Sequence, residues 1–202
     1  MDRWPRAIIR YLSNYQKAVM KKEQYFLGID PGSRVLGYAL IDKNLTAIQV
    51  GTLQLKGAES EKYKTIFNFF QVLIQNYPPK ALGIEWAFYG ENVQSMMKLA
   101  RVQGLLILLA GLHEIEHYEF APTQIKQRLT GRGHAGKDQV ADLISRKIAA
   151  QEDLKAMRND ATDALAIAYC TLEAYQRLPL PAPKKKSQFA SWSDYLKKQT
   201  EH

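Results

Sequence analysis

Two short apolar runs that each end in a carboxylate constrain this chain more than any other feature. Residues 25–30 end at Asp30, just before a Pro-Gly-Ser turn, and residues 81–85 end at Glu85. Short apolar runs bounded by turn residues are typical of buried strands. Functional residues of α/β sheets gather at strand ends. The sequence therefore predicts an α/β fold whose functional site includes Asp30 and Glu85.

Hydrophobic spacing and helix breakers predict the remaining elements. Strands are expected at 25–30, 35–42, 46–55, 81–85 and 117–120, and helices at 59–76, 93–113, from 122 onward, 137–150 and 159–176. An Asp-Lys-Asn turn at 42–44 favours a hairpin between the second and third strands. A hairpin makes those strands antiparallel, so we expect a mixed five-stranded sheet flanked by helices.

The last predicted helix carries two further acids, Asp160 and Asp163. They are three residues apart and share one helix face, while the rest of the helix is apolar and must pack on the sheet. That packing would bring both acids to the strand ends. Clustered carboxylates repel one another unless a cation binds, and oxygen ligands select Mg²⁺ or Mn²⁺. Two such ions about 4 Å apart can activate a water and stabilise the leaving oxygen in phosphodiester cleavage.

Each acid taken singly has a plainer interpretation. Asp160 could cap the last helix, Asp30 could start the turn before Gly32, and Glu85 could be a surface acid. All four acids together, two of them at strand ends, favour the metal site.

Charge and composition restrict the class of protein. The formal net charge is +8, but residues 1–24 hold six Lys/Arg against two acids and residues 178–202 five against two. Such basic tails can bind phosphates or can simply be solvated. Cys170 is the only cysteine, which excludes a disulfide framework and favours the cytoplasm. The longest apolar run, 104–112, is about half the length needed to span a membrane, so we expect no membrane association.

These features divide the chain into three parts. Residues 1–24 form a basic extension, 25–177 a nuclease domain, and 178–202 a Pro-rich linker with a basic tail. The first segment has three interpretations: an organelle transit peptide, residues ahead of a true start at Met20, or a short extra helix. The transit peptide is the alternative to a cytoplasmic location.

Four motifs, in order, resemble the RuvC family of Holliday-junction resolvases. They are Gly28-Ile-Asp-Pro-Gly-Ser-Arg-Val-Leu-Gly-Tyr38, Ile84-Glu85 with Phe88 and Asn92-Val93-Gln94-Ser95, Gln124-Ile-Lys126-Gln with the loop before Lys137, and Asp160-Ala-Thr-Asp163-Ala-Leu-Ala. The first motif alone is weak, because sugar-kinase and actin-like ATPases carry similar strands. The full set covers about residues 25–175 and is highly specific.

The resemblance implies an RNase H-like fold and a homodimer that nicks a four-way DNA junction symmetrically, in recombination and repair. Asp30, Glu85, Asp160 and Asp163 match the family's catalytic acids, which bind two Mg²⁺ per subunit, with Mn²⁺ as a substitute. The family also implies two protein partners, a branch-migration motor and a junction-binding protein.

Other positions gain roles by the same matching. Phe88 matches an aromatic residue that stacks on bases at the junction centre, and Lys126 and Lys137 match lysines near the scissile phosphate. We expect Asn92, Arg128 and Arg132 to contact DNA, and His134 to be a loop residue rather than a ligand. Phe88 could instead belong to the core, and the lysines could be ordinary phosphate anchors. The apolar second half of helix 93–113 fits a dimer interface better than core burial alone.

Three other functions are alternatives to a junction endonuclease. A scaffold that binds junctions without cutting is disfavoured by the intact acids. An actin-like ATPase needs a second phosphate-binding loop and a longer chain. An RNase H-like nuclease for RNA–DNA hybrids is disfavoured, less strongly, by Phe88 and by Lys126 and Lys137.

Overall fold

The computed structural model describes residues 23–86, 93–149 and 159–177, and its centre is a five-stranded sheet in the order β3-β2-β1-β4-β5. The strands are β1 (Tyr25–Asp30), β2 (Val35–Asp42), β3 (Ala47–Gln54), β4 (Pro79–Glu85) and β5 (Glu116–Phe120). The helices are α2 (Glu59–Asn76), α3 (Val93–Leu112), α4 (Pro122–Thr130), α5 (Lys137–Lys147) and α6 (Asn159–Gln176). β2 is antiparallel to both β1 and β3, whereas β4 is parallel to β1 and β5, which confirms the predicted mixed sheet.

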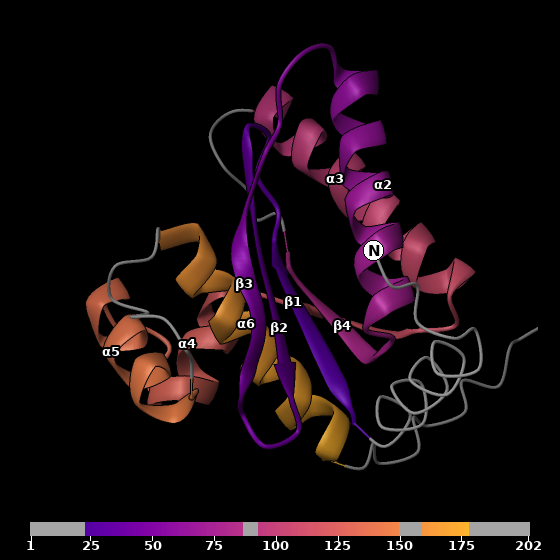
Figure 1. Cartoon of the computed structure of the whole chain (residues 1–202). Helices are drawn as coiled ribbons and strands as arrows, with labels where there is room; N and C mark the ends of the chain where they lie inside the picture. The colour runs from indigo at the N-terminus through magenta and orange to yellow at the C-terminus, as the bar shows by residue number, and fades with distance from the viewer. Residues whose placement is uncertain (1–22, 87–92, 150–158, 178–202) are drawn as a thin grey trace, which may run out of the picture.

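Helices cover both faces of the sheet, in a three-layer arrangement (Figure 1). Alternate residues of each strand point to opposite faces. Leu27 and Ile29 pack with α2 and α3, whereas Phe26 packs with α4, α5 and α6 on the other face. The residues of β1 that lie an even number of positions from Phe26, which are Gly28 and Asp30, therefore face α6.

Strand β3 and helix α5 are shorter than the sequence predicts, and one contact accounts for the late start of β3 and the early end of α5. Thr46 lies outside β3 and instead pairs with Ala149 in an isolated parallel bridge. The backbone turns from helical to extended at Ile148, so α5 ends at Lys147 rather than at 150. The bridge joins segments about a hundred residues apart, which no local pattern reveals.

Helix α6 lies unusually close to the sheet because glycines face it. A Cβ atom at Gly28 would lie 2.2 Å from the backbone N of Ala168, and one at Gly37 would lie 2.0 Å from the backbone O of Asp160. Gly37 pairs with Asp30 across β1 and β2. The first turn of α6 therefore rests on the strand next to Asp30.

Helix α3 has an exposed apolar face along its whole length. Val93, Met97, Leu108 and Leu112 are each at least half exposed, and a Cβ atom at Gly104 would meet nothing within 4 Å. Among the described residues, α3 alone is long and apolar enough to cross a membrane, although the same test is passed by core helices of proteins outside membranes. Only 28% of the most apolar 18-residue stretch of α3 is buried within this chain.

Candidate active site at the ends of two strands

Asp30 and Glu85 lie side by side because of the strand register. β1 and β4 are parallel neighbours, and Ile29 pairs with Ile84. Each acid is the next residue of its strand, so both stand at the same end of the sheet. Side chains alternate along a strand, which turns both carboxylates towards the face that α6 covers. Both acids therefore lie at one edge of the sheet, where the sequence led us to expect a site.

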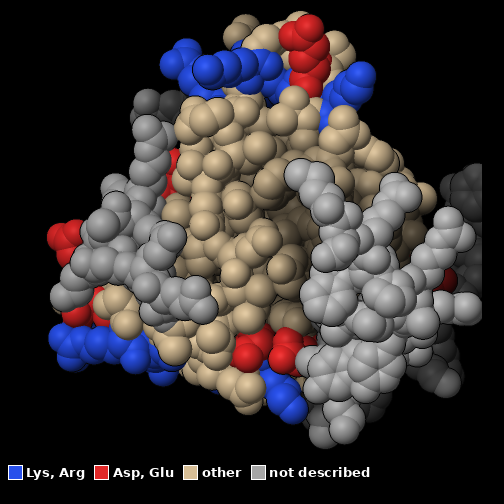
Figure 2. All heavy atoms as spheres, in the orientation of Figure 1, with Lys and Arg blue, Asp and Glu red and all other residues tan. Residues whose placement is uncertain are grey.

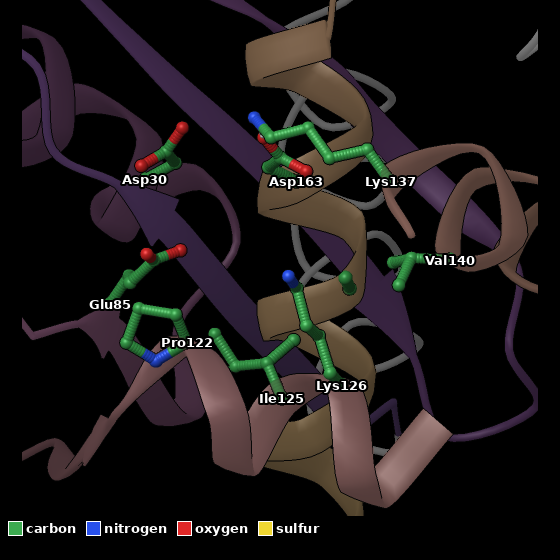
Figure 3. Close-up of a pocket in the computed structure, with 9 residues that line it drawn as sticks. Asp30, Glu85, Pro122, Ile125, Lys126, Lys137, Val140 and Asp163 are labelled. Carbon is green, nitrogen blue, oxygen red and sulfur yellow. Dashed lines mark hydrogen bonds and ion pairs between the residues drawn. The ribbon is translucent and has the colours of Figure 1, made fainter. Parts of the chain in front are cut away.

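Helix α6 adds Asp163 to the two strand-end acids. A pocket of about 210 Å³ is lined by Asp30, Glu85 and Asp163 together with Lys126 and Lys137. Figure 3 shows Asp30 and Glu85 on one side of this space, and Asp163 across from them together with the ends of the Lys126 and Lys137 side chains. Asp160 does not line the pocket, but it lies close enough for its charge to act on Asp30.

The carboxylates perturb one another's protonation. Burial is the main cause that raises the pKa of Asp30 to about 7, and the charges of Glu85, Asp163 and Asp160 add to the rise. Burial and the charge of Asp163 likewise raise the pKa of Glu85. A buried acid beside like charges is costly to ionise, and an added cation would relieve that cost.

Two lysines partly offset this negative charge. Lys137 is the first residue of α5, and its Nζ lies 3.3 Å from Oδ2 of Asp163. The neighbouring acids, Asp163 first, raise the pKa of Lys137. Lys126 projects from α4 and lowers the pKa of Glu85. The side chain of Lys137 is mostly exposed, so it can turn to another anion that enters the pocket.

The rest of the pocket wall is apolar, and the sequence did not single it out. Pro122, Ile125, Val140 and Ala166 line the space beside the charged groups. Nothing but their positions in α4, α5 and α6 distinguishes them from ordinary core residues. Apolar walls lower the local dielectric constant, which strengthens electrostatic interactions inside the pocket.

The acids fit a hard divalent cation by chemistry. Carboxylate oxygens are the ligands that Mg²⁺ and Mn²⁺ prefer, and the charges of Glu85, Asp163 and Asp160, which add to the effect of burial on the pKa of Asp30, are of the kind that a cation neutralises. Within residues 23–86, 93–149 and 159–177, no three acidic, histidine or cysteine side chains already enclose one ion. Closing around an ion therefore requires the side chains to turn, Asp163 away from Lys137 in particular.

Several predicted residues lie elsewhere. Phe88 and Asn92 are outside the described residues. Arg132 and His134 are exposed in the loop between α4 and α5. The guanidinium of Arg128 lies 5.6 Å above the ring of Phe120, beside a separate cavity, and it does not line the acid pocket. The structure thus brings together the four acids and the two lysines but sets Arg128 apart.

Comparisons with known proteins point to one family. The family model described as "Crossover junction endodeoxyribonuclease RuvC" matches residues 26–171. The protein of that name from Cytophaga hutchinsonii is 39% identical over 180 residues, which cover 87% of this chain and 86% of the relative. Its counterpart from Christiangramia forsetii is 40% identical over 160 residues, covering 77% and 82% of the two chains.

Solved structures show the same fold. The structure described as "T. thermophilus RuvC in complex with Holliday junction substrate" matches with a TM-score of 0.69 and 23% identity, covering 76% of this chain and 94% of that one. The yeast mitochondrial Holliday junction resolvase Ydc2 matches with a TM-score of 0.53 and 14% identity, covering 81% and 90%. These likenesses confirm the predicted RNase H-like fold class.

Proposed function

This chain belongs to the RuvC family of crossover junction endodeoxyribonucleases, and from that premise we propose that Asp30, Glu85, Asp160 and Asp163 are its catalytic acids. The family confirms the predicted resemblance and the predicted enzyme class. The protein is a structure-selective endonuclease that resolves four-way (Holliday) junctions in DNA recombination and repair. The observation that carries the residue assignment is the convergence of Asp30, Glu85 and Asp163 on one pocket.

Asp30, Glu85, Asp160 and Asp163 would hold the divalent metal. We infer two Mg²⁺ per subunit, with Mn²⁺ as a substitute, because four carboxylates exceed what one ion needs to balance its charge. Bound ions of this kind lower the pKa of a water and neutralise charge on a phosphate. The acids orient the ions, and the apolar wall of Ile125 and Val140 limits the water in the pocket.

Lys126 and Lys137 would bind the scissile phosphate of the DNA. Both reach the pocket from the side opposite the strand ends, so a phosphodiester between them and the acids would meet cations on two sides. A lysine in this position stabilises negative charge that develops during cleavage. Lys137 would leave Asp163 for the phosphate as ions bind the acid.

DNA contacts outside the pocket follow from the family match. We propose that Phe88 stacks on bases near the junction centre, where one stacked base contributes about 1–3 kcal/mol without reading sequence. Asn92 and Arg132 would contact the backbone nearby. Arg128 is the weakest of these assignments, because its guanidinium packs on Phe120.

The working unit would be a homodimer joined through the exposed apolar face of α3. Val93, Met97, Gly104 and Leu108 recur at helical spacing over about 23 Å of helix. A patch of this length on one protein usually marks an interaction site. A twofold dimer places two equivalent sites on a symmetric four-arm substrate.

Wider assignments rest on the family alone. We propose that a branch-migration motor and its junction-binding partner act with this protein, and that it works in the cytoplasm. The bacterial origin of the curated relatives supports that location over an organelle. Residues 25–177 would form the nuclease domain, and the flanking basic segments lie almost wholly outside the described residues.

The test is cleavage of a synthetic four-way junction in Mg²⁺. Asp30→Asn should abolish cutting and keep junction binding in EDTA, because the substitution removes a metal ligand but no phosphate contact. Glu119→Gln, at an exposed acid of β5, should cut normally. Undiminished cleavage by Asp30→Asn would overturn the assignment. Equal cutting of linear duplex or RNA–DNA hybrid would favour an RNase H-like nuclease that is not selective for four-way junctions.

A further inference from the structure

Gln103 is a polar side chain on the buried face of α3. Its neighbours on that face, Val102, Leu106 and Leu109, are apolar and form the core with the sheet. Gln103 is itself only 6% exposed. A buried amide that lacks a partner costs roughly 2–7 kcal/mol, depending on the reference state. A leucine or methionine would satisfy packing at this position, so the amide must be explained by what it contacts.

The amide of Gln103 bonds to the main chain of a proposed catalytic acid. Its Nε2 donates to the backbone carbonyl of Glu85 at 2.8 Å. The N–H of Trp86 donates to the backbone carbonyl of Phe120, also at 2.8 Å. These two groups belong to the same peptide unit, the one that joins Glu85 to Trp86. That unit is therefore held from α3 on one side and from β5 on the other.

The position of this peptide unit determines where the Glu85 carboxylate points. β4 ends at Glu85, and its pairing with β1 already stops at Ile84, so its last peptide has a strand partner on the β5 side alone. Strand ends open more readily than strand centres. The plane of the peptide fixes the backbone angle at the Cα of Glu85, and with it the direction of the side chain. A loose peptide would let the carboxylate leave the pocket.

We propose that Gln103 is a positioning residue for Glu85, holding the last peptide of β4 so that the carboxylate faces Asp30 and Asp163. This inference rests on the proposed metal-binding role of Glu85. Gln103 touches neither substrate nor metal, and its effect passes through the main chain. Groups that orient a metal ligand typically change metal affinity or activity by about 10–100-fold when they are removed.

The test compares Gln103→Met with Leu109→Met in single-turnover cleavage of a four-way junction over a Mg²⁺ series. Methionine keeps the length of Gln103 but donates no hydrogen bond. We expect a cleavage rate about tenfold lower and a higher Mg²⁺ concentration for half-maximal rate. The junction Kd measured in EDTA should stay within about twofold of wild type. Leu109 is buried in the same helix, so Leu109→Met shows the effect of altered packing around α3 alone.

A second measurement uses the metal-free protein. Hydrogen exchange at the Trp86 amide should be slow in the wild type and faster in Gln103→Met, while Leu109→Met leaves it unchanged. Gln103→Leu, which has a similar volume and no hydrogen-bond donor, should behave like Gln103→Met and replaces it if that variant does not fold. A wild-type Trp86 amide that exchanges as fast as an exposed loop amide would overturn the inference.

Failure of the inference can be separated from failure of the proposed function by Glu85→Gln. If Glu85→Gln is inactive while Gln103→Met matches wild type in rate, Mg²⁺ dependence and Trp86 exchange, only the role of Gln103 is wrong. If Glu85→Gln still cleaves, the proposed function of the acid is wrong. Equal changes in Gln103→Met and Leu109→Met would reduce Gln103 to a packing residue and also overturn the inference.

Discussion

Asp30→Asn should make the metal-free protein more stable at pH 8, although it removes a proposed catalytic group. The pKa of Asp30 in the fold is about 7, against an ordinary value of 3.8, because of burial and then the neighbouring acids. At about 1.4 kcal/mol per pKa unit, ionised Asp30 destabilises the metal-free fold by up to about 4 kcal/mol above pH 7. The unfavourable contribution is absent below pH 4, where Asp30 is protonated in both folded and unfolded chains, and it grows as the pH rises towards 7.

The amide of an asparagine is uncharged like the protonated acid but differs from it in hydrogen-bond geometry, so we expect about half of this free energy to be recovered. A gain of about 2 kcal/mol raises the Tm of a domain of this size by about 4–8 °C. Thermal unfolding in EDTA at pH 8 and at pH 4 measures the effect, which should be present at pH 8 and absent at pH 4. Added Mg²⁺ should raise the Tm of the wild type and narrow the difference.

Glu119→Gln provides the control, because Glu119 is an exposed acid on β5 that does not line the pocket. Its Tm should match the wild type at both pH values. The reasoning fails if Asp30→Asn is no more stable than the wild type at pH 8. It also fails if the gain is the same at pH 4, since repulsion among ionised acids could then not be its cause.

Two further predictions address the lysine and the dimer. Lys137→Met should raise the pKa of Asp30 and Glu85 further, since the ammonium lowers both, so cleavage should be lost more strongly at pH 7 than at pH 9. Lys137→Arg should keep the wild-type pH profile, and equal losses at both pH values would contradict this. Leu108→Lys should reduce the mass in light scattering from twice 23.1 kDa to that value. Val72→Lys, at an equally exposed apolar residue of α2, should remain a dimer, and a dimeric Leu108→Lys would exclude the α3 face.

The sequence predicted the acids of the site because strand ends are local features. Asp30 and Glu85 each end an apolar run, and the alternation of side chains in adjacent parallel strands is enough to place them together. The face of α6 that carries Asp163 follows from the apolar residues of the same helix. The family match then supplied Lys126 and Lys137, for which the chain itself offers only a basic residue near a loop.

The remaining features depend on contacts between distant segments. Arg128 stays a predicted DNA contact, but the sequence did not show that it lies apart from Lys126, two residues before it on α4 and so pointing in a different direction. Only Lys126 reaches the pocket, while Arg128 meets Phe120. The contact between Gln103 and Glu85 spans 18 residues and depends on how α3 rests against β4. A glutamine in an apolar helix was the only local sign of it.

The glycines that contact α6 allow substitutions to move this helix away from the sheet but not towards it. At Gly37 the strand carries no side chain, and the backbone O of Asp160 already occupies the place where a Cβ atom would stand. Any other residue can only move the helix outward, and no substitution there can draw it nearer. Substitutions at Gly37 can therefore increase the distance between Asp160 and Asp30 but cannot decrease it. If a relative came to bind a larger ion or a bulkier substrate, a substitution at Gly37 is one change that would widen the site.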